Sequence, residues 1–199
     1  MNTSPIEPSP VAPNSKPRRR VLAALLCAFG AAALAVAVLA GSALAAGTNL
    51  LVNSSFEKDS DGDGIPNNWI DFGTGIAPKR VCNQSVAGSC SLKFVLDDND
   101  KGVYQNLSIS GDAGDAYKLT FWMKGKLVEI GTGNLFASIN FIPAGGATGF
   151  LPVGTSAWSK HSLIATASAD YTDMAIQLES NALSGKAWFD RFKIVPYVP

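Results

Sequence analysis

Three aspartates at alternate positions, Asp59, Asp61 and Asp63, are the residues whose spacing most directly suggests chemistry. With Gly64 they match positions one, three, five and six of a calcium-binding loop. Oxygen ligands at this density suit Ca²⁺, and glycine permits the sharp turn around the ion. Position twelve of an EF-hand loop is Ile70, which cannot bind a metal, and no flanking helix is predicted. The sequence therefore predicts a calcium loop of another kind, and a solvated polar turn is the alternative.

Cysteine and histidine provide little further chemistry. Cys82 and Cys90 are an even pair, and we favour a disulfide that closes a short loop. His161 lies in an alternating segment with no cysteine or evident serine nucleophile tied to it. The sequence therefore predicts a protein that is not an enzyme. A glycosidase stays open as an alternative, because its two carboxylates need not be close in sequence.

The N-terminal region has the composition of a targeting segment. Residues 1–20 are rich in proline and serine and end in Arg18-Arg19-Arg20, which predicts a disordered basic region. Residues 21–45 contain an apolar run and an Ala-Leu-Ala cleavage pattern, which predict an export signal. If uncleaved, residues 21–40 are long enough to anchor the chain in a membrane. Either way, we expect residues 46–199 to be secreted or at the cell surface.

The charge of residues 46–199 excludes one class of partner. They contain 12 lysines and arginines against 15 aspartates and glutamates, a net charge of −3. Arg80 and Arg191 are the only arginines among them. A nucleic-acid-binding surface needs a basic patch, so no nucleic-acid partner is expected.

Short alternating segments follow one another after residue 46. Their apolar residues recur every second position, and β-branched and aromatic residues are frequent. No sustained helical period occurs there. The predicted strands are 90–96, 102–109, 117–125, 135–142, 158–167, 173–180 and 187–195, with glycine-rich turns such as "PAGGATG" between them. Seven or eight strands in this length predict an all-β fold, an antiparallel two-sheet β-sandwich.

The order of several motifs resembles a known family. "NLLVNSSFE", "SCSLKF", "VYQNLSI", "YKLTFWMKG" and "AWFDRFKIV" follow one another as in the carbohydrate-binding modules appended to bacterial xylanases and cellulases. The resemblance covers nearly all of residues 48–196 and implies a jelly roll of the galactose-binding-like class. The acidic loop is similar to the calcium turns of thrombospondin type 3 repeats.

The resemblance also implies a structural Ca²⁺ between the opening and closing strands. In the family, the Glu of "SFE" and the Asp of "WFD" hold this ion, which here are Glu57 and Asp190. Backbone carbonyls at Ser55 and near Cys90 or Ser91 complete the expected ligands. An unpaired carboxylate in an aromatic-rich strand needs a partner, which agrees with an ion. The alternatives are a salt bridge from Asp190 to a neighbouring cation and exposure on an edge.

Sugar binding by such sandwiches relies on aromatic rings that stack on pyranose faces, with amides and carboxylates around them. Trp122 is the best candidate ring, since alternation places it opposite the apolar row of its strand. The other candidates lie on polar strand faces and could line the same surface: Tyr104, Asn140 and Gln177, with Asn106, Ser138 and Glu179 near them. The expected partner is a polysaccharide or cell-surface glycan. The alternative is a structural or adhesive cell-surface sandwich without a sugar ligand, in which Trp122 only packs.

Overall fold

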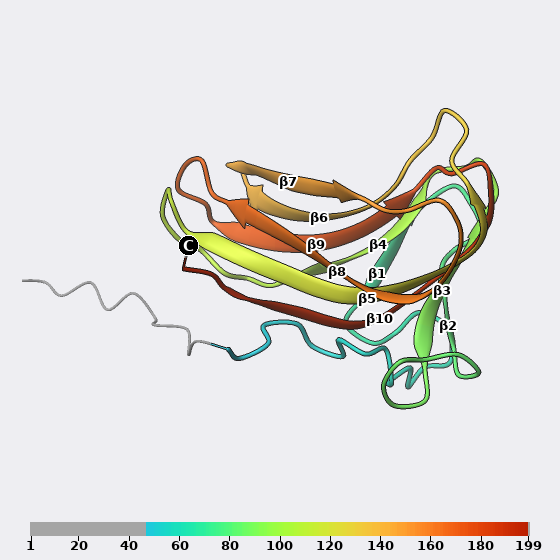
Figure 1. Cartoon of the computed structure of the whole chain (residues 1–199). Helices are drawn as coiled ribbons and strands as arrows, with labels where there is room; N and C mark the ends of the chain where they lie inside the picture. The colour runs from blue at the N-terminus through green and yellow to red at the C-terminus, as the bar shows by residue number, and fades with distance from the viewer. Residues whose placement is uncertain (1–46, 199) are drawn as a thin grey trace, which may run out of the picture. The chain divides into compact units, whose positions relative to one another are not determined.

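The alternating segments form strands throughout residues 47–198, the part of the chain that the computed structural model describes (Figure 1). The first five are β1 (Ile70–Gly73), β2 (Lys79–Val81), β3 (Ser91–Leu96), β4 (Lys101–Asn106) and β5 (Ala116–Glu129). The others are β6 (Leu135–Ile142), β7 (Gly145–Phe150), β8 (Gly154–Thr166), β9 (Asp173–Ser180) and β10 (Ser184–Pro196). The predicted disordered region and export segment lie outside the described residues. Within that described range, no helix has the length and apolarity to span a membrane.

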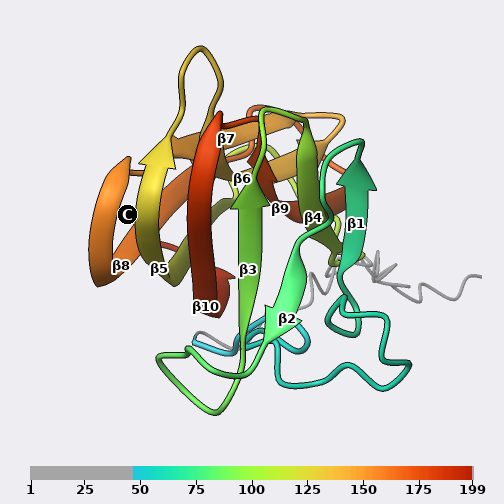
Figure 2. The same cartoon turned by 90° about the vertical axis from the view of Figure 1, so that its right-hand side faces the viewer.

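Two antiparallel sheets pack face to face, as predicted. The first sheet has the order β1-β4-β9-β6-β7, and the second has the order β2-β3-β10-β5-β8. Figure 1 shows the two layers from the side, and Figure 2 shows the strands of the second sheet next to one another. Most neighbours within a sheet are distant in sequence, as expected for a jelly roll rather than a meander.

The core lies between the sheets and follows the period of two. On β5, Leu119, Phe121 and Met123 are buried in the core, whereas Trp122 is only half-buried on the opposite face. Rings from several strands meet in the core; Phe121 stacks on Phe192 with centroids 4.8 Å apart. Burial of large apolar side chains of this kind provides most of the free energy of folding.

The sequence prediction of seven or eight strands is too low, because residues 47–198 form ten. The short strands β1 and β2 follow the acidic loop and were not predicted. The segment Gly145–Phe150 was predicted as a turn but forms β7 against β6. Glycine disfavours strands, so "GGATGF" has no strand signature, and pairing with β6 decides its conformation.

The opening segment of the domain runs along β10, as the family resemblance implied. Leu50 N donates to Ile194 O (3.1 Å), and Phe192 N donates to Ser54 O (2.8 Å). These bonds begin after an irregularity in β10, where the register with β5 shifts between Asp190 and Lys193. Arg191, inside that irregularity, has a φ of 54°. The result is a β-bulge beside Asp190, which changes the direction of the side chains that follow.

Candidate functional site

The outer face of the first sheet gathers aromatic and polar side chains from five strands. The register places Phe136 between Glu179 on one side and Phe150 on the other. It also places Gln177 between Tyr104 and Ser138. We call this surface the polar–aromatic face. Its members are Phe72, Tyr104, Phe136, Ser138, Asn140, Phe150, Gln177 and Glu179.

The rings of the polar–aromatic face flank its polar centre. Phe136 and Phe150 meet edge to face with centroids 6.2 Å apart, and Phe150 is 71 % exposed. On the other side, Phe72 lies 6.2 Å from Tyr104. Phe72 also covers Gly102, where a Cβ would lie 2.2 Å from the ring. Glycine is therefore required at position 102 for Phe72 to approach the sheet.

Amide and carboxylate groups form a connected row at the centre of this face. Asn140 Nδ2 donates to Ser138 Oγ (3.0 Å) and to Gln177 Oε1 (3.3 Å), and Gln177 Nε2 donates to Glu179 Oε2. Burial raises the pKa of the Glu179 carboxyl above its usual value, and the negative charge of Asp100 adds to this rise. Side chains held in place in this way present fixed donors and acceptors to a ligand.

The structure brings together most of the predicted ligand-binding residues but not Trp122. Tyr104, Asn140 and Gln177 share the polar–aromatic face, whereas Trp122 lies on β5 in the other sheet and faces away from the core. The expectation that Trp122 lines the same surface is therefore wrong, since the two outer faces lie on opposite sides of the sandwich. The sequence analysis missed Phe72, Phe136 and Phe150. For Phe136 a signal existed, because alternation places it on the same face as Asn140.

Trp122 instead lines a cavity of about 360 Å³ on the outer face of the second sheet. Thr120 and Lys160 border it from β5 and β8, and Arg191 and Lys193 border it from β10. The opening segment provides the remaining polar wall through Asn49, Ser54 and Ser55. Basic side chains line this cavity, whereas the residues of the polar–aromatic face include none.

A disulfide closes the loop 82–90, as predicted, and the loop binds both carboxylates of the expected calcium site. Cys82 and Cys90 are joined with an S–S distance of 2.07 Å. Within the loop, the N–H groups of Val86 and Ala87 donate to Asp190 Oδ2 at 2.7 and 2.9 Å. Glu57 Oε1 accepts from the N–H groups of Ser89 and Cys90 at 3.1 and 3.2 Å.

Asp190 is completely buried and forms no ion pair among the described residues. Neither predicted alternative, a salt bridge or an exposed edge position, is therefore found. Burial raises the pKa of Asp190; its hydrogen bonds from backbone N–H groups lower it, and the charge of Glu57 raises it further. The carboxylates of Asp190 and Glu57 thus lie near enough to each other for their charges to interact.

The other ligands expected at this calcium site are backbone carbonyls at Ser55 and near Cys90 or Ser91, and they stay a prediction. The side-chain hydroxyl of Ser91 donates to Gln84 O at 2.6 Å. Ser55 borders the cavity that contains Trp122. Arg80 binds the backbone oxygens of Phe56 and Glu57 rather than the Glu57 carboxylate. Within residues 47–198, the carboxylate of Glu57 therefore forms no ion pair, like that of Asp190.

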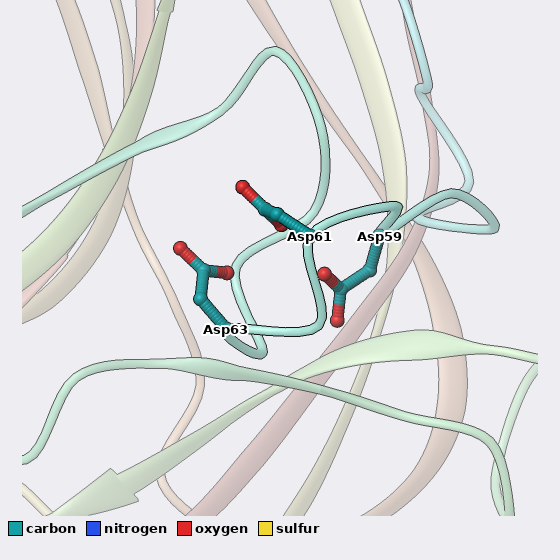
Figure 3. A group of neighbouring side chains, drawn as sticks. All are labelled: Asp59, Asp61 and Asp63. Carbon is teal, nitrogen blue, oxygen red and sulfur yellow. The ribbon is translucent and has the colours of Figure 1, made fainter.

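The acidic loop brings its three carboxylates together. Oxygens of Asp59, Asp61 and Asp63 all lie within 4.8 Å of one another (Figure 3). Asp59 Oδ1 accepts from Gly62 N (2.9 Å) and Asp63 Oδ1 from Ile65 N (2.6 Å), so the backbone holds two of them. Asp61 and Asp63 are exposed and Asp59 is half-buried. The alternate positions of the three aspartates in the sequence thus bring their carboxylates together in the structure.

His161 has a serine partner that the sequence analysis did not identify. Ser159 Oγ lies 2.9 Å from His161 Nε2, and the imidazole stacks on Phe121 with centroids 5.6 Å apart. Burial lowers the pKa of His161. The structure shows no carboxylate bonded to the other ring nitrogen within residues 47–198. A serine–histidine contact without an orienting group is weaker than a catalytic triad.

Comparisons with known proteins agree with this architecture. Neither a protein-family model nor a curated protein matches the sequence. Among solved structures, TmCBM61 in complex with β-1,4-galactotriose matches 75 % of this chain and 99 % of its own, with 15 % identity and a TM-score of 0.58. The CBM22-1 xylan-binding domain of Paenibacillus barcinonensis Xyn10C matches 76 % and 96 %, with 18 % identity and a TM-score of 0.53. The fold is that of a carbohydrate-binding module.

The carbohydrate-binding-module fold also occurs in an enzyme. A cyclase from Fischerella sp. TAU matches 75 % of this chain and 98 % of its own, with 14 % identity and a TM-score of 0.57. At this identity the likeness shows the fold alone, so function depends on the particular surfaces of this chain.

Proposed function

We propose that this protein is a non-catalytic module that binds glycans through its polar–aromatic face. The observation that carries the proposal is the arrangement of that face, with rings on both sides of a bonded amide–carboxylate row. Aromatic rings pack on the apolar faces of pyranoses, while fixed amides pair with hydroxyls. Phe150 is a large apolar side chain exposed to solvent, and a bound sugar would cover it.

We further propose that the ligand is a linear β-1,4-linked polysaccharide. The two modules of similar fold are described with β-1,4-galactotriose and as xylan-binding. The rings of Phe136 and Phe150 lie on β6 and β7, and those of Phe72 and Tyr104 lie on β1 and β4. Rings at both ends of the face suit an extended chain that crosses all five strands.

Replacing Phe136 by alanine is expected to weaken glycan binding about fivefold or more, because a stacked ring contributes about 1 kcal/mol or more beyond its contact area. Isothermal titration with β-1,4-linked xylo- and galacto-oligosaccharides measures this effect. Ile164→Ala is the matched control, since Ile164 is an exposed apolar residue on β8, in the other sheet. Equal losses in both variants would contradict a site on the polar–aromatic face. If wild-type protein binds no glycan in a broad panel, the structural or adhesive alternative takes the place of this proposal.

We propose two structural Ca²⁺ sites, one at Glu57 and Asp190 and one at the acidic loop. The first is supported by the complete burial of Asp190 beside a second carboxylate, neither of which forms an ion pair with another described residue. An uncompensated buried charge is costly, and a divalent cation offsets it. The second is supported by the convergence of Asp59, Asp61 and Asp63. Both sites would hold the loops that precede β3 against the sandwich.

Calcium is expected to raise the melting temperature, since an ion bound only by the folded protein stabilises it by about 2.7 kcal/mol at 100 times its Kd. Thermal melts with calcium and with EDTA measure the shift. Asp61→Asn removes a charge from the exposed acidic cluster and should reduce the calcium response without lowering the melting temperature in EDTA. A calcium response identical to that of the wild type would leave the acidic loop as a polar turn.

We also propose that residues 21–45 export the chain, as the disulfide supports, because such bonds persist in oxidising compartments. The N-terminal sequence of the exported protein tests cleavage. A mature chain that begins at Ala46 is the expected result, and retention of residues 21–40 would indicate the membrane anchor instead.

A further inference from the structure

The cavity beside Trp122 combines an aromatic ring with positive charge. Lys160, Arg191 and Lys193 border it, and the described residues that line it include no aspartate or glutamate. Its volume of about 360 Å³ lies within the range of small-ligand pockets. We propose that this cavity is a second ligand site, separate from the polar–aromatic face, that takes a sugar unit carrying a carboxylate.

Three adjacent strands position the ring and the cations. Trp122 on β5 is directly opposite Lys160 on β8 and opposite Asp190 on β10. Lys193 is opposite Thr120, which is the neighbour of Trp122 on the same face of β5. The indole therefore lies in the middle of the site, with a cation from β8 on one side and cations from β10 on the other. Directly opposite residues in antiparallel strands are close enough for their side chains to contact one ligand.

The bulge in β10 adds Arg191 to this face. Strict alternation would turn the residue after Asp190, which is Arg191, toward the core. Instead Phe192 is buried in the core and Arg191 is exposed. The φ of 54° at Arg191 is a conformation that residues other than glycine, asparagine and aspartate rarely adopt. Such a conformation persists only where surrounding contacts impose it, and it is frequent at binding sites. Here Arg191 N donates to Asp190 Oδ1 at 2.6 Å, which fixes the turn.

The positive charge of the cavity is not neutralised by neighbouring side chains. Lys160, Arg191 and Lys193 take part in no ion pair among residues 47–198. Asp190, the nearest carboxylate on the strand, is completely buried and directs its oxygens to N–H groups of Val86, Ala87 and Arg191. An anion that enters the cavity therefore meets cations that have no competing partner.

The chemistry of the lining fits a uronate better than a simple anion. An indole face packs on the apolar face of a pyranose, and a guanidinium pairs with a planar carboxylate through two parallel hydrogen bonds. The wall is preorganised, because Asn49 Nδ2 donates to Ser54 Oγ (3.0 Å) and to Phe192 O (2.9 Å). Trp122 and Thr120 are half-buried, so a ring and a hydroxyl remain accessible to a ligand.

Isothermal titration of the full-length protein with α-1,4-trigalacturonate and β-1,4-trimannuronate tests the proposal. We expect one of them to bind, and its methyl ester, which has the same rings without the charge, to bind at least about tenfold more weakly. Trp122→Ala and Arg191→Asn should each weaken binding at least about tenfold, and asparagine tolerates the backbone conformation at position 191. Lys126→Gln is the matched control, because Lys126 lies exposed on β5 outside the cavity, and it should bind like the wild type.

Three results would overturn the proposal: no binding of either oligouronate, equal binding of acid and ester, or full binding by Trp122→Ala. Complete displacement of the oligouronate by an equal concentration of inorganic phosphate would also overturn it, since the cavity would then recognise an anion rather than a sugar. Phe136→Ala should leave this titration unchanged, because Phe136 lies on the other sheet. Loss of neutral-glycan binding at the polar–aromatic face and loss of oligouronate binding at this cavity can therefore be told apart.

Discussion

Replacing Asp190 by alanine is expected to lower the free energy of unfolding by about 3 kcal/mol, more than any other single substitution named above. The carboxylate is completely buried and accepts hydrogen bonds from three backbone N–H groups, those of Val86, Ala87 and Arg191. Alanine leaves these three donors, which form partly buried hydrogen bonds, without their acceptor. Relief of the repulsion from Glu57 offsets only a part of this loss, because each of the three lost hydrogen bonds to a charged acceptor contributes about 1 kcal/mol or more.

Urea denaturation in EDTA measures the effect of Asp190→Ala without a contribution from calcium. Asp190→Asn keeps one oxygen acceptor and removes the charge, so it should lose less stability than alanine but should also lose the calcium response. Asp71→Ala, at an exposed position on β1, is the control and should stay within about 0.5 kcal/mol of the wild type. An Asp190→Ala protein as stable as this control would show that the loop 82–90 does not depend on the carboxylate.

Removal of the disulfide is expected to have the second largest effect on stability. Cys82 and Cys90 are separated by 8 positions, and closing a loop of this length stabilises a folded chain by about 2–3 kcal/mol through the entropy of the unfolded state. The double variant Cys82→Ala/Cys90→Ala should lose that amount in urea denaturation. Binding at the proposed Glu57–Asp190 calcium site should weaken as well, because the same loop donates to both carboxylates.

Reduction of the wild-type protein with dithiothreitol provides the comparison for the double variant. It should shift the denaturation midpoint by the same amount, whereas it should leave the double variant unchanged. A stability loss that appears in the variant but not on reduction would assign the effect to the packing of Cys90, which is 2 % exposed, rather than to the bond.

The sequence predicted the strands whose side chains alternate strongly. On β5 and β9 the apolar residues recur every second position, and the structure has strands at both places. It did not predict β7, because "GGATGF" has neither apolar alternation nor β-branched residues beyond one threonine. Nor did it predict β1 and β2, which have 4 and 3 residues and are too short to show a period. Strands of this kind are determined by their partners rather than by their own residues.

The candidate site was only partly predicted, because alternation within a strand gives only a part of the necessary information. Alternation shows which residues of one strand share a face, and it correctly separated Trp122 from Phe121. It does not show which sheet a strand joins, since that depends on pairing between distant segments. Trp122 was therefore grouped with Asn140, although β5 and β6 are neighbours in sequence but lie in opposite sheets. Burial of the Asp190 carboxylate could also not be seen from the sequence, because the loop that covers it begins about a hundred positions earlier.

The position of the two proposed ligand surfaces has a consequence for how the domain would act on a polymer. The polar–aromatic face and the cavity beside Trp122 lie on opposite sides of one sandwich. Two sites that point away from each other on a rigid body cannot engage neighbouring units of a single stretched chain, so they gain no avidity there. If both proposals hold, the two sites would instead bind two different polysaccharides, one neutral and one acidic, on either side of the same domain. Such a domain would act as a cross-link between polymers of a cell wall or matrix.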